Sequence, residues 1–298
     1  MVKTLSELHD LALIGKRKKL VLAAAHDRHA LQAAISASAK GLVDIALVGD
    51  IIKVEEMLNS MNHDIRGVEI INEPDNERAA EIAVRMVSEK HADIVMKGCL
   101  PTSCLLKAVL NKEWGLRSGD LLSHLSIFEL PAYHKLLSLT DAAMNIAPDL
   151  NAKVSILNNA VNYLLKLKIE TPKVAILSAV ETVNPDIESS VHAATITKMA
   201  DRGQIKNCIV DGPLALDNAI NINSARIKKI NSPVAGDADL ILGNDLDSSN
   251  ALYKSFIYLA SARCAAVIVG ARAPIVLTSR ADSDETKLNS IVLAACTN

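Results

Sequence analysis

The stretch Gly270-Ala-Arg-Ala-Pro-Ile-Val-Leu-Thr-Ser-Arg-Ala-Asp-Ser283 joins the end of an apolar strand to the start of a helix. The Ile-Val-Leu run is typical of a buried strand, and the residues after Ser283 repeat apolar side chains at helical spacing. Between them stand Ser279, Arg280 and Asp282. Ligands of open α/β sheets bind beyond the carboxyl ends of strands, and helix N-termini attract anions. The stretch therefore indicates either an anion site or a polar loop in which Asp282 or Ser283 caps the helix.

Strand-like apolar runs alternate with helix-like segments along the whole chain. The predicted strands are residues 20–24, 45–48, 68–71, 94–96, 125–128, 136–139, 174–177, 209–210, 240–242, 267–269 and 275–277. The predicted helices include residues 29–40, 77–91, 152–167, 189–202, 249–262 and 284–296. This alternation predicts an α/β fold with mostly parallel sheets. About 11 strands are too many for one comfortable open sheet. We therefore expect two domains that meet near residues 130–150, with a binding cleft between them.

Composition and charge exclude several kinds of partner. Half of the 298 residues are hydrophobic but only 2% are aromatic, which predicts an aliphatic core of the kind found around parallel strands. The formal charge is −2, with 32 basic and 34 acidic residues and no basic tract or aromatic platform, so we expect no nucleic-acid partner. The apolar runs are strand-sized and broken by charges, so we expect no membrane span.

The cysteines and the first residues indicate a reducing, cytoplasmic location. The five cysteines are spread along the chain without a CxxC pair, so neither a disulfide framework nor a zinc site is expected. The opening residues lack the apolar core and cleavage site of a signal peptide. Calcium-loop spacing also fails in the acidic segments near Asp237 and Asp245, where Asp247 or Ser248 is expected to cap a helix. We expect no metal.

Two further loops follow predicted strands and carry groups suited to anions. His26-Asp-Arg-His29 follows the first strand, where a solvated loop with Asp27 as helix cap is slightly favoured over an anion site. Lys97-Gly-Cys-Leu-Pro-Thr-Ser103 follows the strand 94–96. There Lys97 and Gly98 suit an anion, and Thr102 or Ser103 is expected to cap the helix that carries Lys107. Neither GxGxxG after the first strand nor a GxxxxGK[ST] motif is present, so both nucleotide motifs are missing.

A third loop, Asp211-Gly-Pro-Leu-Ala-Leu-Asp217, is expected to turn from a strand into a helix, with Pro213 at the helix start. Together with Asp245-Leu-Asp-Ser-Ser-Asn-Ala-Leu-Tyr-Lys254, Pro274-Ile-Val-Leu-Thr-Ser-Arg280 and the Lys97 loop, it resembles the phosphate acetyl/butyryltransferase family. The resemblance runs from about residue 20 to the end. Within the family, Ser279-Arg-Ala-Asp-Ser283 is closer to the butyryltransferase branch than to the Ser-Arg-Gly of the acetyltransferases.

The resemblance implies a two-domain α/β architecture like that of isocitrate and isopropylmalate dehydrogenases. The first domain would comprise residues 1–132 plus the returning C-terminal helix at 280–298, and the second would comprise residues 133–279. The implied reaction is reversible transfer of a butanoyl group between CoA and inorganic phosphate, without cofactor, metal or covalent enzyme intermediate. CoA and phosphate would then be substrates, and a homodimer is the implied assembly.

The resemblance also assigns roles. Ser279 matches the serine that donates to the tetrahedral oxyanion, and Arg280 matches the arginine that binds phosphate. The acetyltransferase branch has an aspartate, the proposed base for the CoA thiol, where this chain has Thr286. We therefore expect a neighbouring carboxylate, preferably Glu285, to act as the base. The expected substrate-binding residues are Lys97, Gly98, Thr102, Lys107, Asp211, Gly212, Pro213, Asn250, Lys254 and Gly270.

Three alternatives stay open at this point. The first is phosphate acetyltransfer, which differs only in the size of the acyl pocket. The second is a non-catalytic CoA-binding paralogue, which the missing aspartate suggests. The third is a decarboxylating dehydrogenase on the same fold, although the acidic metal site and the nucleotide motif that such enzymes need are not visible.

Overall fold

A computed structural model describes residues 2–61, 68–119, 121–279 and 282–296. The chain forms two compact units. We call Ser6–Asp120 with Ala265–Asn298 the terminal unit, and Leu121–Cys264 with Met1–Leu5 the middle unit. Each is a mostly parallel α/β structure, as the strand–helix alternation predicts.

Strand pairing explains which unit two of the strands belong to. Strand β5 (Ser123–Glu129) belongs to the middle unit because it pairs antiparallel with β6 (Leu137–Thr140). Strand β11 (Ile275–Val276) belongs to the terminal unit because it pairs parallel with β4 (Ile94–Lys97). Strand pairing, which a single sequence does not reveal, thus helps to set the bounds of the two units.

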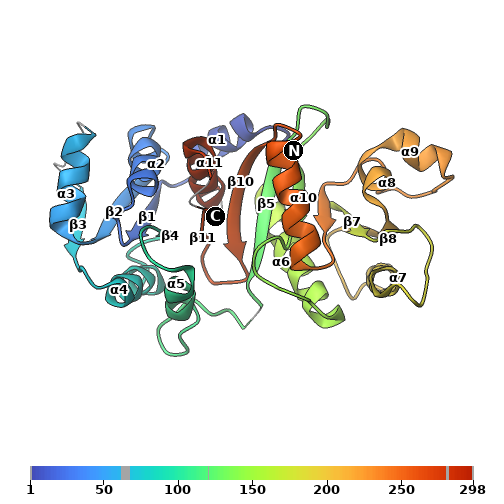
Figure 1. Cartoon of the computed structure of the whole chain (residues 1–298), viewed down its shortest axis with the longest axis horizontal. Coiled ribbons are helices and arrows are strands. Elements are labelled where there is room, and N and C mark those ends of the chain that lie inside the picture. The colour runs from blue at the N-terminus through green and yellow to red at the C-terminus, as the bar shows by residue number, and fades with distance from the viewer. Residues whose placement is uncertain (1, 62–67, 120, 280–281, 297–298) are drawn as a thin grey trace. The chain divides into compact units, whose positions relative to one another are not determined.

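The terminal unit has the strand order β3-β2-β1-β4-β11-β10, in which only the β10–β11 pair is antiparallel. Its remaining strands are β1 (Lys18–Ala23), β2 (Val43–Gly49), β3 (Glu69–Asn72) and β10 (Arg263–Val269), the last entering from the middle unit. Its helices are α1 (Leu5–Ile14), α2 (Arg28–Ala39), α3 (Ile51–Ser60), α4 (Asn76–Ser88), α5 (Thr102–Val109) and α11 (Asp284–Ala295). The central strand β1 is fully buried from Leu20 onward because α2 and α4 both pack against it (Figure 1).

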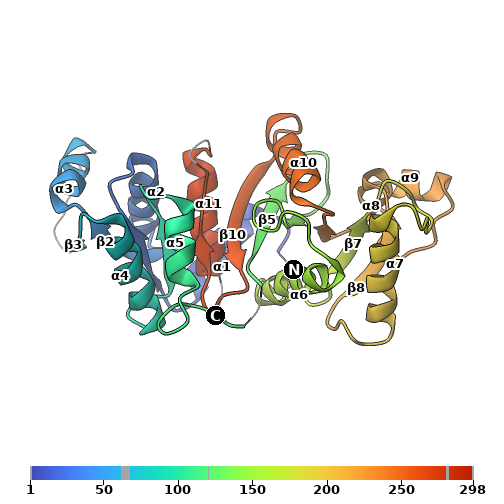
Figure 2. The ribbon, with the colours of Figure 1, turned by 60° about the horizontal axis from the view of Figure 1, so that its bottom comes forward.

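The C-terminal helix α11 packs against α2 in the terminal unit, and α4 packs against α5 (Figure 2). Side-chain caps fix where several helices begin. Asp27 caps α2, Asp75 caps α4 and Ser283 caps α11. The first two lie directly before helices that the sequence predicts, and Ser283 is one of the two caps expected for the last helix. Helix α5 instead begins after Pro101 without a side-chain cap, so the expected capping by Thr102 or Ser103 is wrong.

The middle unit has the strand order β5-β6-β9-β7-β8, with only β5–β6 antiparallel. Its further strands are β7 (Lys173–Leu177), β8 (Ile209–Leu214) and β9 (Leu240–Leu242). Its helices are α6 (Leu150–Lys166), α7 (Glu188–Asp201), α8 (Leu216–Ile220), α9 (Ile222–Ile227) and α10 (Leu246–Tyr258). Its core is mainly aliphatic and includes an edge-to-face contact between Phe128 and Phe256, whose ring centroids lie 5.2 Å apart.

Two sequence expectations fail in the middle unit. Pro213 lies inside β8 rather than at the start of a helix, after a cis Gly212–Pro213 bond. Asp245 caps α10 by accepting the Ser248 N–H at 2.8 Å, so the cap is not Asp247 or Ser248. In both cases the helix, α8 or α10, starts a few residues away from the position that local preference favours.

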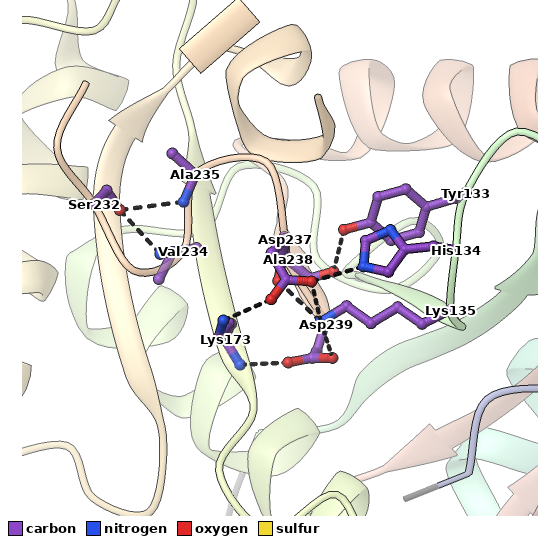
Figure 3. Close-up of polar contacts among 10 residues, drawn as sticks. All are labelled: Tyr133, His134, Lys135, Lys173, Ser232, Val234, Ala235, Asp237, Ala238 and Asp239. Carbon is purple, nitrogen blue, oxygen red and sulfur yellow. Dashed lines mark hydrogen bonds and ion pairs between the residues drawn. The ribbon is translucent and has the colours of Figure 1, made fainter. Parts of the chain in front are cut away.

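The acidic residues before β9 are bound by lysines (Figure 3). Lys135 Nζ lies 2.6 Å from Asp239 and 3.0 Å from Asp237, and Lys173 Nζ lies 2.6 Å from Asp237. Burial would raise the pKa of the Asp237 carboxyl, but hydrogen bonds from Lys173, Lys135 and His134 outweigh it and hold that pKa well below its ordinary value. This network ties the starts of β6, β7 and β9 together.

The described residues offer neither a metal site nor a membrane span. No group of three or more His, Cys, Asp or Glu side chains is placed to hold a metal ion within the described ranges. None of the helices described is both long enough and apolar enough to cross a membrane.

Candidate functional site

The carboxyl ends of three neighbouring parallel strands meet in the terminal unit. Ala23 of β1 pairs with Lys97 of β4, and Val276 of β11 pairs with Met96 of β4. The loops that follow these strands therefore leave the sheet at the same edge. They are the His26 loop, the Lys97 loop and the Thr278–Ser279 loop that the sequence singles out.

A cavity of about 150 Å³ lies where these loops meet the N-terminal turns of α2 and α11. It is lined by Asp27, His29, Ala30, Lys97, Gly98, Thr278, Ser279 and Lys287. The structure thus brings together three of the predicted site residues, namely Lys97, Gly98 and Ser279. Arg280, the predicted phosphate ligand, lies outside the described residues.

Gly98 allows β4 to end in close contact with the loop after β1. Its N–H donates to the Ala23 carbonyl at 2.8 Å, and the Cys99 N–H donates to the Ala24 carbonyl at 2.8 Å. A Cβ on Gly98 would lie 2.2 Å from the Ala24 oxygen, a distance that no side chain tolerates. Gly98 therefore has two roles: it lines the cavity, and its lack of a side chain allows the close backbone contact that forms the cavity wall.

Asp282 holds the backbone of Ser279. Its Oδ2 accepts the Ser279 N–H at 2.7 Å. Burial raises the pKa of the Asp282 carboxyl, while this hydrogen bond and the charge of Lys287 act in the opposite direction. The sequence-based choice for the base, Glu285, is exposed on the first turn of α11.

Thr286, which stands where the acetyltransferase branch has its aspartate, belongs to the helix cap. Its N–H donates to Ser283 Oγ at 3.1 Å, and the two hydroxyl oxygens lie 3.0 Å apart. Asp284, the carboxylate before Glu285, lies 3.0 Å from Nδ1 of His29 and so connects the first turns of α11 and α2.

Asp27 caps α2 by accepting the Ala30 N–H at 3.0 Å, which confirms the capping interpretation of the His26 loop. Asp27 also lines the cavity, so it is both a helix cap and part of the candidate site.

Lys287 is a cavity residue that the sequence-based reasoning missed. It lies on the first turn of α11 and is buried, with 3% of its surface exposed. A signal was present, because Lys287 is four residues before the fully buried Ile291 and so falls on the apolar face of the predicted helix. A lysine on that face is unusual.

Thr102 and Lys107, which are also predicted to bind substrate, lie outside this cavity. Thr102 is the first residue of α5 and is half-buried. Lys107, on the same helix, is exposed, with its Nζ 3.7 Å from Glu77. It lines a separate hollow of about 380 Å³ that Trp114 also borders.

The remaining predicted substrate residues divide between structural positions and a second hollow. Asp211 and Gly212 lie in β8, where a Cβ on Gly212 would come within 3.0 Å of Ile176. Gly270 has a φ of +88°, which favours glycine, and its carbonyl accepts the Ser118 hydroxyl at 2.6 Å. Asn250 and Lys254 line a hollow of about 560 Å³ on α10 in the middle unit.

Comparison with known proteins decides the family. The model of the family described as "Phosphate acetyl/butaryl transferase" matches residues 3–85 and 76–295. The chain belongs to this family. It is 49% identical to a "Probable phosphate butyryltransferase" of Bacillus subtilis over 292 residues, which is 98% of this chain and 97% of the relative.

Two further relatives extend the comparison. A "Phosphate butyryltransferase" of Clostridium acetobutylicum is 44% identical over 99% of this chain and 98% of its own. The crystal structure of a branched-chain phosphotransacylase from Enterococcus faecalis matches with a TM-score of 0.83 and 33% identity, and covers 94% of this chain and 98% of that one. As a phosphate acetyl/butyryltransferase family member, the chain is an acyltransferase, which agrees with the resemblance found in its loops.

Proposed function

We propose that this family member is a phosphate butyryltransferase. In the forward direction an oxygen of hydrogen phosphate attacks the thioester carbon of butanoyl-CoA, the carbon–sulfur bond breaks, and the phosphate proton ends on the CoA sulfur. The products are butanoyl phosphate and CoA, and the reverse reaction retraces these steps. The catalytic task is to hold two anionic substrates together and to stabilise the oxyanion between them.

The observation that carries this proposal is the placement of Ser279 and Lys97 in one cavity at the ends of β11 and β4. A serine hydroxyl at this position can donate to the tetrahedral oxyanion, and an ammonium group beside it can balance phosphate charge. The proposal assigns Ser279 to the oxyanion and Arg280 to phosphate. The proposal also keeps eight further candidate contacts to substrate: Thr102, Lys107, Asp211, Gly212, Pro213, Asn250, Lys254 and Gly270.

The base that removes the CoA thiol proton in the reverse direction is proposed to be Glu285. Glu285 is exposed on the first turn of α11, where a substrate thiol can reach it. We expect Glu285→Gln to lower kcat about 100-fold or more for acyl transfer to CoA. Retention of wild-type kcat in Glu285→Gln, together with its loss in Asp282→Asn, would reassign the base to Asp282.

The acyl group is tested by comparing three thioesters. Release of the CoA thiol is followed with butanoyl-CoA, isobutanoyl-CoA and acetyl-CoA at saturating phosphate. The proposal expects the highest kcat/KM for butanoyl-CoA. A kcat/KM for acetyl-CoA equal to or above it would make the protein a phosphate acetyltransferase, and no thiol release with any thioester would leave a non-catalytic CoA-binding protein.

The proposal also covers partners and setting. Acyl-CoA and inorganic phosphate are the substrates, no cofactor or metal is required, and neither nucleic acid nor membrane is a partner. We propose a cytoplasmic homodimer, because closed two-fold dimers are the commonest assemblies of this size. We expect turnover to survive dialysis against a chelator. We also expect the protein to sediment at twice the chain's mass of 31.9 kDa.

A further inference from the structure

Lys287 is buried at the start of α11, although its side chain is one that carries a charge. Its Nζ donates to the backbone carbonyl of Asp282. Among the residues that the structure describes, no carboxylate oxygen forms an ion pair with it within 4.0 Å. The Asp282 carboxylate is close enough for the lysine charge to act on its pKa, but that carboxylate binds the Ser279 N–H. Lysines are seldom this buried without a charged partner, and a carbonyl dipole compensates a full charge only partly.

Lys287 lines the same cavity as Lys97. The two lysines come from different elements, Lys97 from the end of β4 and Lys287 from the first turn of α11. The acidic side chain that lines the cavity, Asp27, already accepts the Ala30 N–H as the cap of α2. Two lysines, each donating to a backbone carbonyl, and one carboxylate already bound to a backbone N–H thus line the cavity, a balance that favours an anion. The N-terminal end of α11 adds to that preference.

We propose that Lys287 binds the phosphate group that reacts at Ser279, as a second cation beside Lys97. This inference rests on the proposed function, which supplies the phosphate as inorganic phosphate in one direction and as acyl phosphate in the other. Ammonium groups on two sides of a phosphate bind it as point charges and limit its rotation. With Ser279 in the same wall, the attacking oxygen is then held beside the thioester carbon.

The phosphate groups of CoA have the same chemistry, and steady-state kinetics separate the two sources. In Lys287→Met, which keeps the apolar stem and removes the charge, we expect the KM for inorganic phosphate to rise about 10- to 100-fold. The KM for butanoyl-CoA should change less than about threefold, and Lys287→Arg should recover part of the loss. A rise in the KM for butanoyl-CoA with an unchanged KM for phosphate would overturn the proposal and assign Lys287 to CoA.

The matched control is Lys198→Met, which removes an exposed lysine on α7 that pairs with Asp201 at 3.0 Å. Its KM for phosphate should equal that of the wild type. An equal rise in Lys198→Met and Lys287→Met would also overturn the proposal, because it would show a general effect of net charge rather than a ligand.

A binding measurement keeps this inference separate from the proposed function. At the same concentration, inorganic phosphate should raise the thermal unfolding temperature of the wild type more than that of Lys287→Met, whether or not either protein turns over butanoyl-CoA. An equal phosphate-dependent rise in both proteins would overturn the inference. If Lys287→Met does not fold, Lys287→Gln is used in the same assay with the same two outcomes. Phosphate stabilisation that depends on Lys287 in a protein without acyl transfer would retain the inference and remove the proposed function.

Discussion

The Asp282 carboxylate accepts the backbone N–H of Ser279 at 2.7 Å, across the loop that joins β11 to α11. The bond fixes the direction of the chain at the residue proposed to stabilise the oxyanion. Asp282 also lies immediately before Ser283, the cap of α11. A single carboxylate therefore connects the geometry of the candidate site to the start of the last helix.

We expect Asp282→Ala to lower kcat about tenfold or more while leaving the KM for butanoyl-CoA little changed, because Asp282 positions Ser279 without being assigned to substrate. Asp282→Asn keeps an acceptor oxygen and should recover part of the activity. Because burial raises the pKa of this carboxyl, it becomes protonated at a higher pH than an ordinary aspartate. The fall of kcat/KM on the acidic side should therefore lie above the ordinary value of 3.8 and be absent in Asp282→Asn. Wild-type kcat and pH profile in Asp282→Ala would contradict the positioning role.

Ser279→Ala tests the oxyanion donor. Removing one such donor typically lowers kcat about 100- to 1,000-fold, and we expect a loss of this size with butanoyl-CoA and phosphate. Ser155→Ala is the control, because Ser155 is a half-buried serine on α6, in the middle unit, whose hydroxyl donates to the Asn151 carbonyl. Equal rates in the two variants would remove Ser279 from the mechanism.

Gly98→Ala tests the close approach of β4 to the loop after β1. Its new Cβ would meet the Ala24 oxygen at 2.2 Å, so the backbone must move, at a cost of about 1–3 kcal/mol, and the cavity wall moves with it. Both the thermal unfolding temperature and kcat should fall. In Gly41→Ala the Cβ meets nothing within 4 Å, and only a φ of +74° opposes it. We expect that variant to lose some stability and to keep its kcat, and an equal loss of kcat in both would contradict the explanation.

Asp239→Ala tests the lysine–aspartate network of the middle unit. The side chains of Asp239 and Lys135 are 6% and 9% exposed, and removing one partner of a buried pair costs about 3–5 kcal/mol. The exposed pair of Lys198 with Asp201 should contribute only about 0–1 kcal/mol. Chemical unfolding of Asp239→Ala and Asp201→Ala measures the difference. Equal midpoints would show that the buried network adds no stability.

The lowered pKa of Asp237 predicts how the stability of the same network depends on pH. Its pKa is lowered in the folded protein, so the ionised carboxylate stabilises the fold above the ordinary pKa of 3.8, and this stabilisation is lost as the pH falls below it. The unfolding temperature of the wild type should therefore decline between about pH 5 and pH 3. Asp237→Asn should be less stable at pH 7 and decline less over that interval. Parallel curves for the two proteins would exclude Asp237 as a source of the acid sensitivity.

The order of strands and helices along the chain could be predicted, and their pairing could not. All the predicted strands overlap strands of the structure, because buried parallel strands are continuous apolar runs such as residues 20–24. Helices α1 and α3 are not among those predicted. In α3 only Val54 and Leu58 are buried, which is too weak a pattern to separate a helix from a polar connection.

Local sequence by itself determined the α/β class, the family resemblance and the candidate loops after β1, β4 and β11. Apolar periodicity and short motifs are properties of neighbouring residues, so a single sequence is enough to recognise them. Only the tertiary structure decided that Lys97, Ser279 and Lys287 line one cavity whereas Lys107 lines another. Residues 97, 279 and 287 lie far apart or on different elements, and the parallel pairing of β4 with β11 brings them together. That pairing depends on packing across the whole terminal unit, which no local pattern encodes.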